Sequence, residues 1–234
     1  MSATLAVRVF RTVAVAAVAL TCGGAPPEQL DSQLVVQKYV MALDAVTMPK
    51  NVVFAYTVSQ LGPSNLEQRH RIYRSGSSVR DETIALDGVA LRRKIVRISR
   101  RQDRYAVDRL GPKAAEYQML FLTSARDGAH FDYTFELTPL VRRSVPSVDS
   151  LTIDGARFLP RVIRFRTAAG DAQGTAEVRY APFGPYWMPV LATIDARVGG
   201  KPARERITWE DYRFPERLPP STFAAPRRLP SGAR

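Results

Sequence analysis

The stretch WMPVLATIDARV, residues 187–198, decides the fold class of this chain. Its apolar residues recur at every second position, and the charged residues Asp195 and Arg197 stand between them. Successive side chains of a β-strand point to opposite faces, so this pattern predicts a strand that buries one face only. The apolar face consists of Met188, Val190, Ala192, Ile194, Ala196 and Val198.

The same period of two extends through most of the chain after residue 50. It is clear in NVVFAYTVSQ (51–60), EYQMLFLTS (116–124) and HFDYTFEL (130–137). The predicted apolar faces are Val52, Phe54, Tyr56 and Val58; Tyr117, Met119, Phe121 and Thr123; and Phe131, Tyr133, Phe135 and Leu137. Each of these strands should bury one side of a sheet.

Turn signals separate the strands at short intervals, among them GPSN, SGSS, FGP, GGK and three Asp-Gly pairs. Asp-Gly and Gly-Gly tolerate the positive φ of tight hairpins, so consecutive strands should mostly be antiparallel neighbours. Counting the segments predicts about 11–12 strands. Strands and helices do not alternate along the chain, which disfavours a parallel sheet.

One helix is predicted before the strands, in PPEQLDSQLVVQKYVMALDAV, residues 26–46. Its broad apolar side consists of Leu30, Leu34, Val35, Tyr39, Met41 and Leu43. A sheet of 11–12 strands tends to curl or close. The predicted fold class is therefore mainly β, with a curved antiparallel sheet whose apolar concave face is covered by an N-terminal helix.

The first residues have the layout of an export signal. Arg8 and Arg11 precede the uncharged run TVAVAAVALT, which small residues and a proline pair follow. The run is about half of the roughly 20 residues that span a bilayer. We therefore expect residues 1–21 to be a signal peptide that directs the chain out of the cytoplasm, to the periplasm or cell envelope.

Cys22 is the single cysteine of the chain, so it has no partner for an internal disulfide. Three interpretations remain open. Cys22 is the lipidated first residue of a membrane-anchored lipoprotein, a residue removed with the signal, or an unpaired thiol. The segment AVALTC resembles a bacterial lipoprotein signal, with its Leu one place late.

Length and charge limit the number of domains and the kinds of partner that this protein can have. Removal of residues 1–21 takes away two arginines and no acid, which lowers the net charge from +12 to +10. The basic residues are dispersed, without an arginine-rich helix or a groove interleaved with aromatic residues, so we expect no nucleic-acid partner. Residues 22–225 are long enough for one domain, expected to be monomeric. The tail, residues 226–234, combines Pro, Gly and Arg and is predicted to be disordered.

Two longer segments resemble the periplasmic lipoprotein-carrier superfamily, the LolA/LolB-like proteins. IDGARFLPRVIRF (153–165) looks like its strand pair joined through an Asp and a Leu-Pro. YRFPERLPPSTF (212–223) is similar to its closing strand and Leu-Pro-x-x-x-Phe ending. The likeness extends over nearly all of residues 28–225, but HRIYRSGSSVR stands where the carriers have Pro-Gly-x-x-Arg-Trp.

This resemblance implies an unclosed β-barrel wrapped around a helix, with an apolar cavity that accepts acyl chains and no chemistry performed on them. The adaptable side chains of the predicted concave face are consistent with such a cavity. The predicted lining is Phe54, Tyr56, Met119, Phe121, Tyr133, Phe135, Met188, Val190, Ala192 and Ile194. Alternation shows which face of a strand is buried, but not whether that face borders a cavity, so the same residues could instead form an ordinary core.

Catalytic patterns are weak throughout the sequence. His70 and His130 are 60 positions apart, and neither has the spacing that supplies a second metal ligand. RSGSS lacks the strand-to-helix setting of a nucleophile elbow. Glu210 and Asp211 of WEDY are adjacent in one strand and so point to opposite faces. We therefore expect no enzyme, no metal and no cofactor.

Two functional classes remain. The first is a non-enzymatic cell-envelope protein that binds a lipid, a lipoprotein acyl chain or another apolar ligand. The alternative is an envelope structural, interaction or sensor protein that uses the same fold without a ligand.

Overall fold

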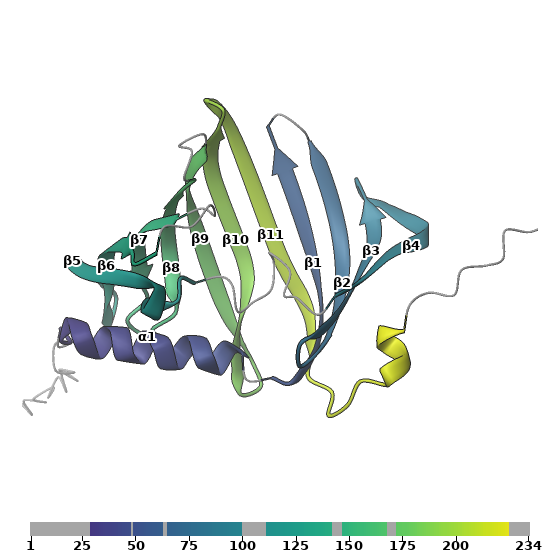
Figure 1. Ribbon diagram of the computed structural model, residues 1–234, viewed down its shortest axis with the longest axis horizontal. Helices are drawn as coiled ribbons and strands as arrows, with labels where there is room; N and C mark the ends of the chain where they lie inside the picture. Colours follow the sequence, from purple (N-terminus) through teal and green to yellow (C-terminus); the bar gives the residue numbers. More distant parts are fainter. Residues whose placement is uncertain are drawn as a thin grey trace, which may run out of the picture.

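The computed structural model describes residues 29–47, 49–62, 65–99, 111–141, 147–167 and 172–224. One helix precedes a single antiparallel sheet that is strongly curved and not closed (Figure 1). The predicted signal peptide, Cys22 and the predicted disordered tail lie outside the described residues. Within the described residues, no helix combines the length and apolarity needed to cross a bilayer.

Helix α1 spans Ser32–Thr47 and is capped by the residue before it. The backbone N–H groups of Gln33 and Leu34 donate to Oδ1 of Asp31, at 2.8 and 3.4 Å. An Asp in this position satisfies donors that the first turn leaves free, which is why the helix begins here.

The buried side of α1 is narrower than the sequence predicts. Val35, Tyr39 and Val46 are buried, at the spacing of a single helical stripe. Leu34 is 39% exposed and Met41 is 71% exposed, so their predicted place on the packed side is wrong. A single helix on a sheet has no further layer beside it, so the side chains on its lateral faces stay exposed.

The sheet contains eleven strands, within the predicted number. Their bounds are β1 Asn51–Leu61, β2 Leu66–Ser75, β3 Ser78–Leu86, β4 Val89–Ser99, β5 Tyr117–Asp127, β6 His130–Pro139, β7 Ser147–Ile153, β8 Pro160–Arg166, β9 Ala172–Phe183, β10 Tyr186–Val198 and β11 Lys201–Arg213. Short 3-10 turns, η2 (Ala114–Glu116) and η3 (Pro220–Phe223), precede β5 and follow β11.

The order across the sheet is β4-β3-β2-β1-β11-β10-β9-β8-β7-β6-β5, and the paired strands are antiparallel. The pair of β1 and β11 joins strands far apart in sequence, with Tyr56 opposite Trp209. All the other pairs are between consecutive strands, as the turn signals predict. The sheet ends at β4 and β5, which are consecutive in the chain but lie at opposite edges (Figure 1).

Positive φ angles occur where the turn signals predict them. In the β3–β4 turn, Asp87 has φ 48° and Gly88 has φ 76°; in the β10–β11 turn, Gly199 has φ 56° and Gly200 has φ 79°. Glycine tolerates this conformation, which lets a two-residue loop reverse the chain.

Bulges interrupt the alternation at two places where the sequence predicts it to be continuous. A register shift between Phe121 and Thr123 moves Thr123 off the face it was predicted to share with Phe121. A second shift, between Pro189 and Leu191, leaves Pro189 fully buried and Val190 only partly buried. An extra residue in one strand changes which side chains face inward.

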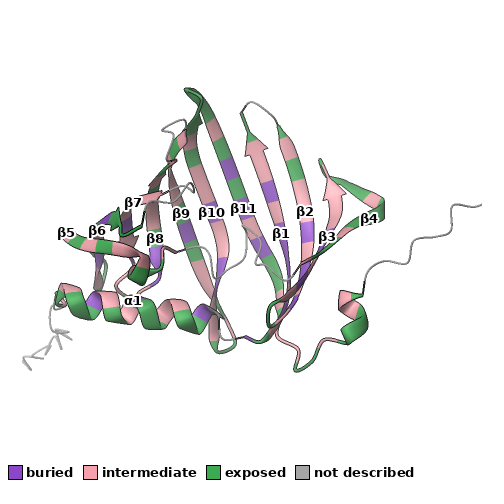
Figure 2. Ribbon diagram, viewed as in Figure 1, coloured by how far each residue is buried: buried purple, intermediate pink, exposed green. Residues whose placement is uncertain are grey.

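The core consists of three clusters of buried side chains. One joins α1 to β6 and β7 through Val35, Tyr39, Tyr133, Phe135, Leu137, Leu151 and Ile153. A second is centred on β1, β10 and β11, and a small third surrounds Val46, Leu159 and Met188. Figure 2 shows buried positions along the middle of β1, β2, β10 and β11, whereas the tip of the β10–β11 hairpin is exposed.

Candidate functional site

The residue pairings between neighbouring strands allow one face of the sheet to be followed from β5 to β1, and we call this the inner face. Opposed residues in antiparallel strands share a face. The pairings carry a single row from β5 to β1: Phe121, Phe135, Leu151, Ile163, Ala176, Ile194, Glu205 and Gln60. Ile163 packs against the cluster that contains Val35 and Tyr39, so the inner face is the one on which α1 lies.

The helix closes one part of this face. The Tyr39 hydroxyl donates to the carbonyl oxygen of Pro112 at 2.6 Å, and the backbone N–H of Leu30 donates to the Tyr133 hydroxyl at 2.9 Å. Burial, together with the nearby Tyr180 and Tyr117, raises the pKa of Tyr39 well above its ordinary value. Tyr39 is therefore a neutral donor that ties α1 to the loop before η2.

A crevice of about 390 Å³ remains between α1 and the edge of the sheet at β5. Gln33 and Val36 of α1 line one wall, and Met119, Phe121 and Phe135 line the other. The Phe121 and Phe135 rings meet edge to face, with centroids 5.8 Å apart. Three of the ten predicted lining residues therefore border this space.

A second cavity, of about 350 Å³, lies on the inner face near the β10–β11 hairpin. Ile194 lines it, together with Phe165, Ala196 and Ala203. Ala196 is opposite Ala203 in the register, so their two small methyl groups lie side by side in the lining of the cavity. We call this space the alanine pocket.

The other predicted lining residues have different surroundings. Phe54, Tyr56 and Ala192 are buried in the β1–β10–β11 cluster, Tyr133 lies under α1, and Met188 is fully buried beside Val46. Val190 is partly buried at the bulge. The cavities thus begin where the packed clusters end.

A larger hollow lies at the same strands on the opposite face of the sheet. It has a volume of about 710 Å³ and is lined by Arg164, Asp195 and Arg197 among others. Arg164, Thr175 and Asp195 are successive partners in the register, whereas the inner row next to them is Phe165, Gly174 and Ala196. The charged side chains of this hollow therefore point away from the alanine pocket.

The inner face also carries a buried polar group on β1–β3. His70 Nδ1 lies 2.7 Å from Asp81 Oδ1, and His70 Nε2 lies 3.2 Å from Gln68 Oε1. The imidazole stacks on Tyr56, with the ring planes 1° apart and the centroids separated by 4.7 Å. These contacts fix the ring between neighbours, which is the arrangement of a structural histidine.

His130 lies at the start of β6, far from His70 along the sheet order, and has its own partners. Its Nε2 is 3.3 Å from Asp154 Oδ1 and 3.9 Å from Asp132 Oδ1. The hydrogen bond from Arg161 lowers the pKa of Asp127, whereas burial raises the pKa of Asp132 despite the same arginine. The sequence prediction that neither histidine has a second metal ligand in its spacing overlooked the two aspartates beside His130 in DGAHFD (127–132).

The remaining candidates from the sequence occupy structural positions. RSGSS forms the β2–β3 turn. Glu210 pairs with Arg69 at 2.5 Å on an exposed surface, and Asp211 has φ 58°, where the pairing of β1 with β11 shifts register. These carboxylates do not converge on one substrate.

An unclosed antiparallel barrel curved around one helix is the LolA-like fold. A LolA superfamily protein from Nitrosomonas europaea matches 84% of this chain and 99% of its own, with a TM-score of 0.53 and 14% identity. An outer membrane lipoprotein-sorting protein domain from Vibrio parahaemolyticus matches 82% and 97%, with a TM-score of 0.55 and 12% identity.

A DUF1329 family protein from Desulfovibrio piger has the same fold, with 82% and 96% covered, a TM-score of 0.55 and 10% identity. At these identities the likeness defines the fold alone. No protein-family model and no curated protein matches the sequence.

Proposed function

We propose that this chain is an exported cell-envelope protein that binds an acyl chain or another apolar ligand on its inner face, without catalysis. The alanine pocket is the observation that carries the proposal. It is an apolar space of about 350 Å³ on the helix side of the sheet, within the size range of small-molecule sites. The crevice lined by Met119, Phe121 and Phe135 offers a second apolar surface under α1.

The structural neighbours support the same class of ligand. One of them is described as an outer membrane lipoprotein-sorting protein domain. A lipoprotein acyl chain is a fitting ligand for the alanine pocket, because its hydrocarbon matches the apolar lining of Phe165, Ile194 and Ala196.

The proposal includes the compartment. Residues 1–21 act as the export signal, and Cys22 is the site of a lipid anchor. If so, Cys22→Ser should move the protein from the membrane fraction to the soluble fraction and remove acyl mass from its N-terminus. Native protein that begins after Cys22 would exclude the anchor.

Two alanines on the same strand provide a matched test of ligand binding. Ala196 lines the alanine pocket, whereas Ala192 is 2% exposed inside the packed cluster. Ala196→Phe should fill the pocket, leave stability nearly unchanged and abolish binding of a fluorescent fatty acid. Ala192→Phe should overpack the core and cost about 1–3 kcal/mol in free energy of unfolding.

Gently purified wild-type protein should also release lipid into an organic extract, detectable by mass spectrometry. An empty extract, together with equal fatty-acid binding by wild type and Ala196→Phe, would refute the carrier proposal.

One observation favours the alternative class, an envelope interaction or sensor protein. The edge strands β4 and β5 carry exposed apolar side chains, among them Ile95, Leu120 and Leu122. Unpaired edges of this kind can add a strand from another protein. Under this alternative, the protein would extract without lipid and crosslink to a partner through β4 or β5.

A further inference from the structure

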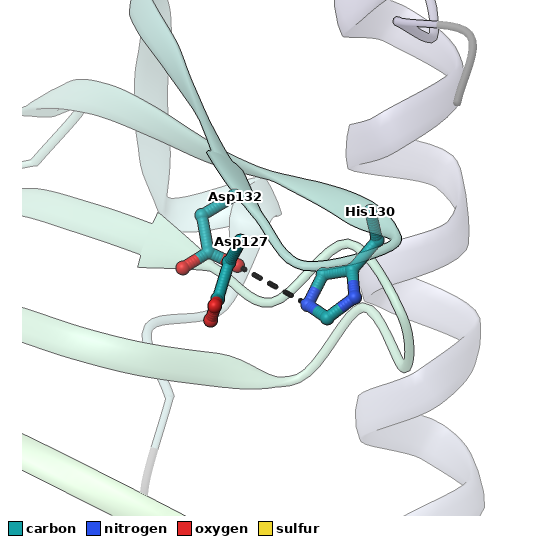
Figure 3. A group of neighbouring side chains, drawn as sticks. All are labelled: Asp127, His130 and Asp132. Atoms are coloured by element: carbon teal, nitrogen blue, oxygen red, sulfur yellow. Dashed lines mark ion pairs between the residues drawn. The ribbon is translucent and has the colours of Figure 1, made fainter. Parts of the chain in front are cut away.

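The β5–β6 hairpin gathers metal-ligating side chains outside the proposed lipid site. Asp127, His130 and Asp132 each offer an atom, and these atoms all lie within 4.8 Å of one another (Figure 3). They come from the end of β5 and the start of β6, a six-residue stretch of the chain. Figure 3 shows the two carboxylates and the imidazole ring gathered at the hairpin.

Asp132 gives this cluster a feature that a surface ion pair lacks. The residue is only 8% exposed, and its Oδ1 is buried with no hydrogen-bond partner in the described structure. The same oxygen is directed toward His130 Nε2, 3.9 Å away (Figure 3). A buried carboxylate oxygen without a donor is costly unless a cation or a proton satisfies it.

Arg161 binds one oxygen of each of the two carboxylates. Arg161 Nη1 donates to Oδ2 of both Asp127 and Asp132, which leaves Oδ1 of each for another ligand. On the other flank, Asp154 lies beside His130 and pairs with Arg157 at 2.9 Å. Groups that bind the outer oxygens of ligating carboxylates commonly orient them toward a metal.

We propose that Asp127, His130 and Asp132 form a binding site for a divalent transition metal, with Zn²⁺ as its best fit. A tetrahedral Zn²⁺ with bonds of about 2.0–2.2 Å holds its ligand atoms about 3.3–3.6 Å apart. The distance of 3.9 Å from His130 Nε2 to Asp132 Oδ1 closes to this range with a small side-chain movement. An imidazole among carboxylates favours zinc over the oxygen-loving Mg²⁺ and Ca²⁺.

The cluster is open to a cation from one side. A cavity of about 370 Å³ adjoins it, lined by Asp127, His130 and Asp154 and also by Arg157, Arg161 and Arg179. The carboxylates are thus balanced by arginines around them, while Oδ1 of Asp132 has no hydrogen-bond donor among the described residues. This cavity offers a route for the metal and room for a water molecule as the fourth ligand.

The two histidines of the chain provide the control. Untagged full-length protein, stripped with a chelator, is titrated with ZnCl₂ by calorimetry. Wild type should bind one equivalent, and His70→Gln should bind equally well, because His70 has only one carboxylate beside it. His130→Gln and Asp132→Asn should weaken zinc binding at least tenfold, and MgCl₂ should not compete.

A measurement on the wild type guards against variants that fail to fold. With two histidines in the chain, NMR of the imidazole signals should show zinc shifting one histidine and leaving the other in place. Absence of zinc uptake by wild type, or a shift of the His70 signal instead of the His130 signal, would overturn the proposal. Fatty-acid binding should be the same with and without zinc, which keeps this test separate from that of the carrier function.

Discussion

The two parts of the sheet are stabilised in different ways. Strands β5–β8 pack against α1, and their buried cluster is made of aromatic and aliphatic side chains such as Tyr133, Phe135 and Leu151. We call this the helix-covered half. The remaining strands, β1–β4 with β9–β11, form what we call the helix-free half, which α1 meets only at its border, where Val46 packs beside Met188 of β10. The helix-free half buries charged and polar side chains as well, among them Asp81 and Glu82.

This difference shows how one continuous face can hold both a core and a cavity. Where α1 lies on β6 and β7, large apolar side chains fill the space between the two layers, and only the crevice at the β5 edge stays open. Beyond the helix, hydrogen bonds such as that between His70 and Asp81 satisfy part of the buried polar groups, and the alanine pocket remains open near the β10–β11 hairpin. Ligand binding is therefore expected first in the alanine pocket and second in the crevice between α1 and β5.

The largest expected effect tests this contrast with two phenylalanines on the inner face. Phe135 is 1% exposed under α1, so Phe135→Ala should lower the free energy of unfolding by about 3–5 kcal/mol. Phe165 is half-buried beside the alanine pocket, and Phe165→Ala should cost roughly 1 kcal/mol. Urea unfolding measures both. Equal losses would mean that the inner face beside the alanine pocket is packed as tightly as the inner face under α1.

A pH effect of intermediate size is expected in the helix-free half. Glu82 accepts from Lys94 and Arg80, at 2.9 and 2.7 Å. Burial alone would raise the pKa of Glu82, but these hydrogen bonds outweigh it and lower the pKa below its ordinary value. The stabilisation is therefore complete above the unfolded pKa, near pH 4.5, and is lost as the pH falls through the lower folded pKa.

Glu82→Gln supplies the comparison for this effect. At neutral pH the variant should be less stable than wild type by about 1.5–3 kcal/mol, because hydrogen bonds to a charged group are lost. The gap should narrow in acid, as measured by urea unfolding at several pH values. A gap that does not change with pH would show that the Glu82 charge contributes nothing.

The smallest effect concerns the start of α1. Asp31→Ala removes the cap of the helix and should cost about 1 kcal/mol, whereas Asp31→Asn should retain most of the stability. Thermal unfolding followed by circular dichroism measures this difference. If both variants lose the same stability, the cap is not what fixes the beginning of the helix.

Much of the fold follows from local patterns. Alternation placed Val52, Phe54, Tyr56 and Val58 on one buried face, and the Asp87-Gly88 and Gly199-Gly200 turns predicted hairpins that the structure contains. The candidate sites followed less directly. Of the predicted lining residues, Met119, Phe121, Phe135 and Ile194 border cavities, while others such as Ala192 lie in packed clusters. The DGAHFD segment was readable as a local cluster, but its arginine partners were not.

Most strands, most of their inward faces, the hairpin neighbours and the helix could be predicted from the sequence, because each follows from a local pattern of residues. The tertiary structure alone decided that β1 pairs with β11, which separates the edges β4 and β5, and where the bulges at Phe121 and Pro189 shift the alternation. It also decided that Arg161 meets Asp127 and Asp132, and that Ala196 faces space while Ala192 does not. The physical reason is that alternation specifies which side of a strand is apolar, whereas long-range pairing and the reach of α1 specify what covers it.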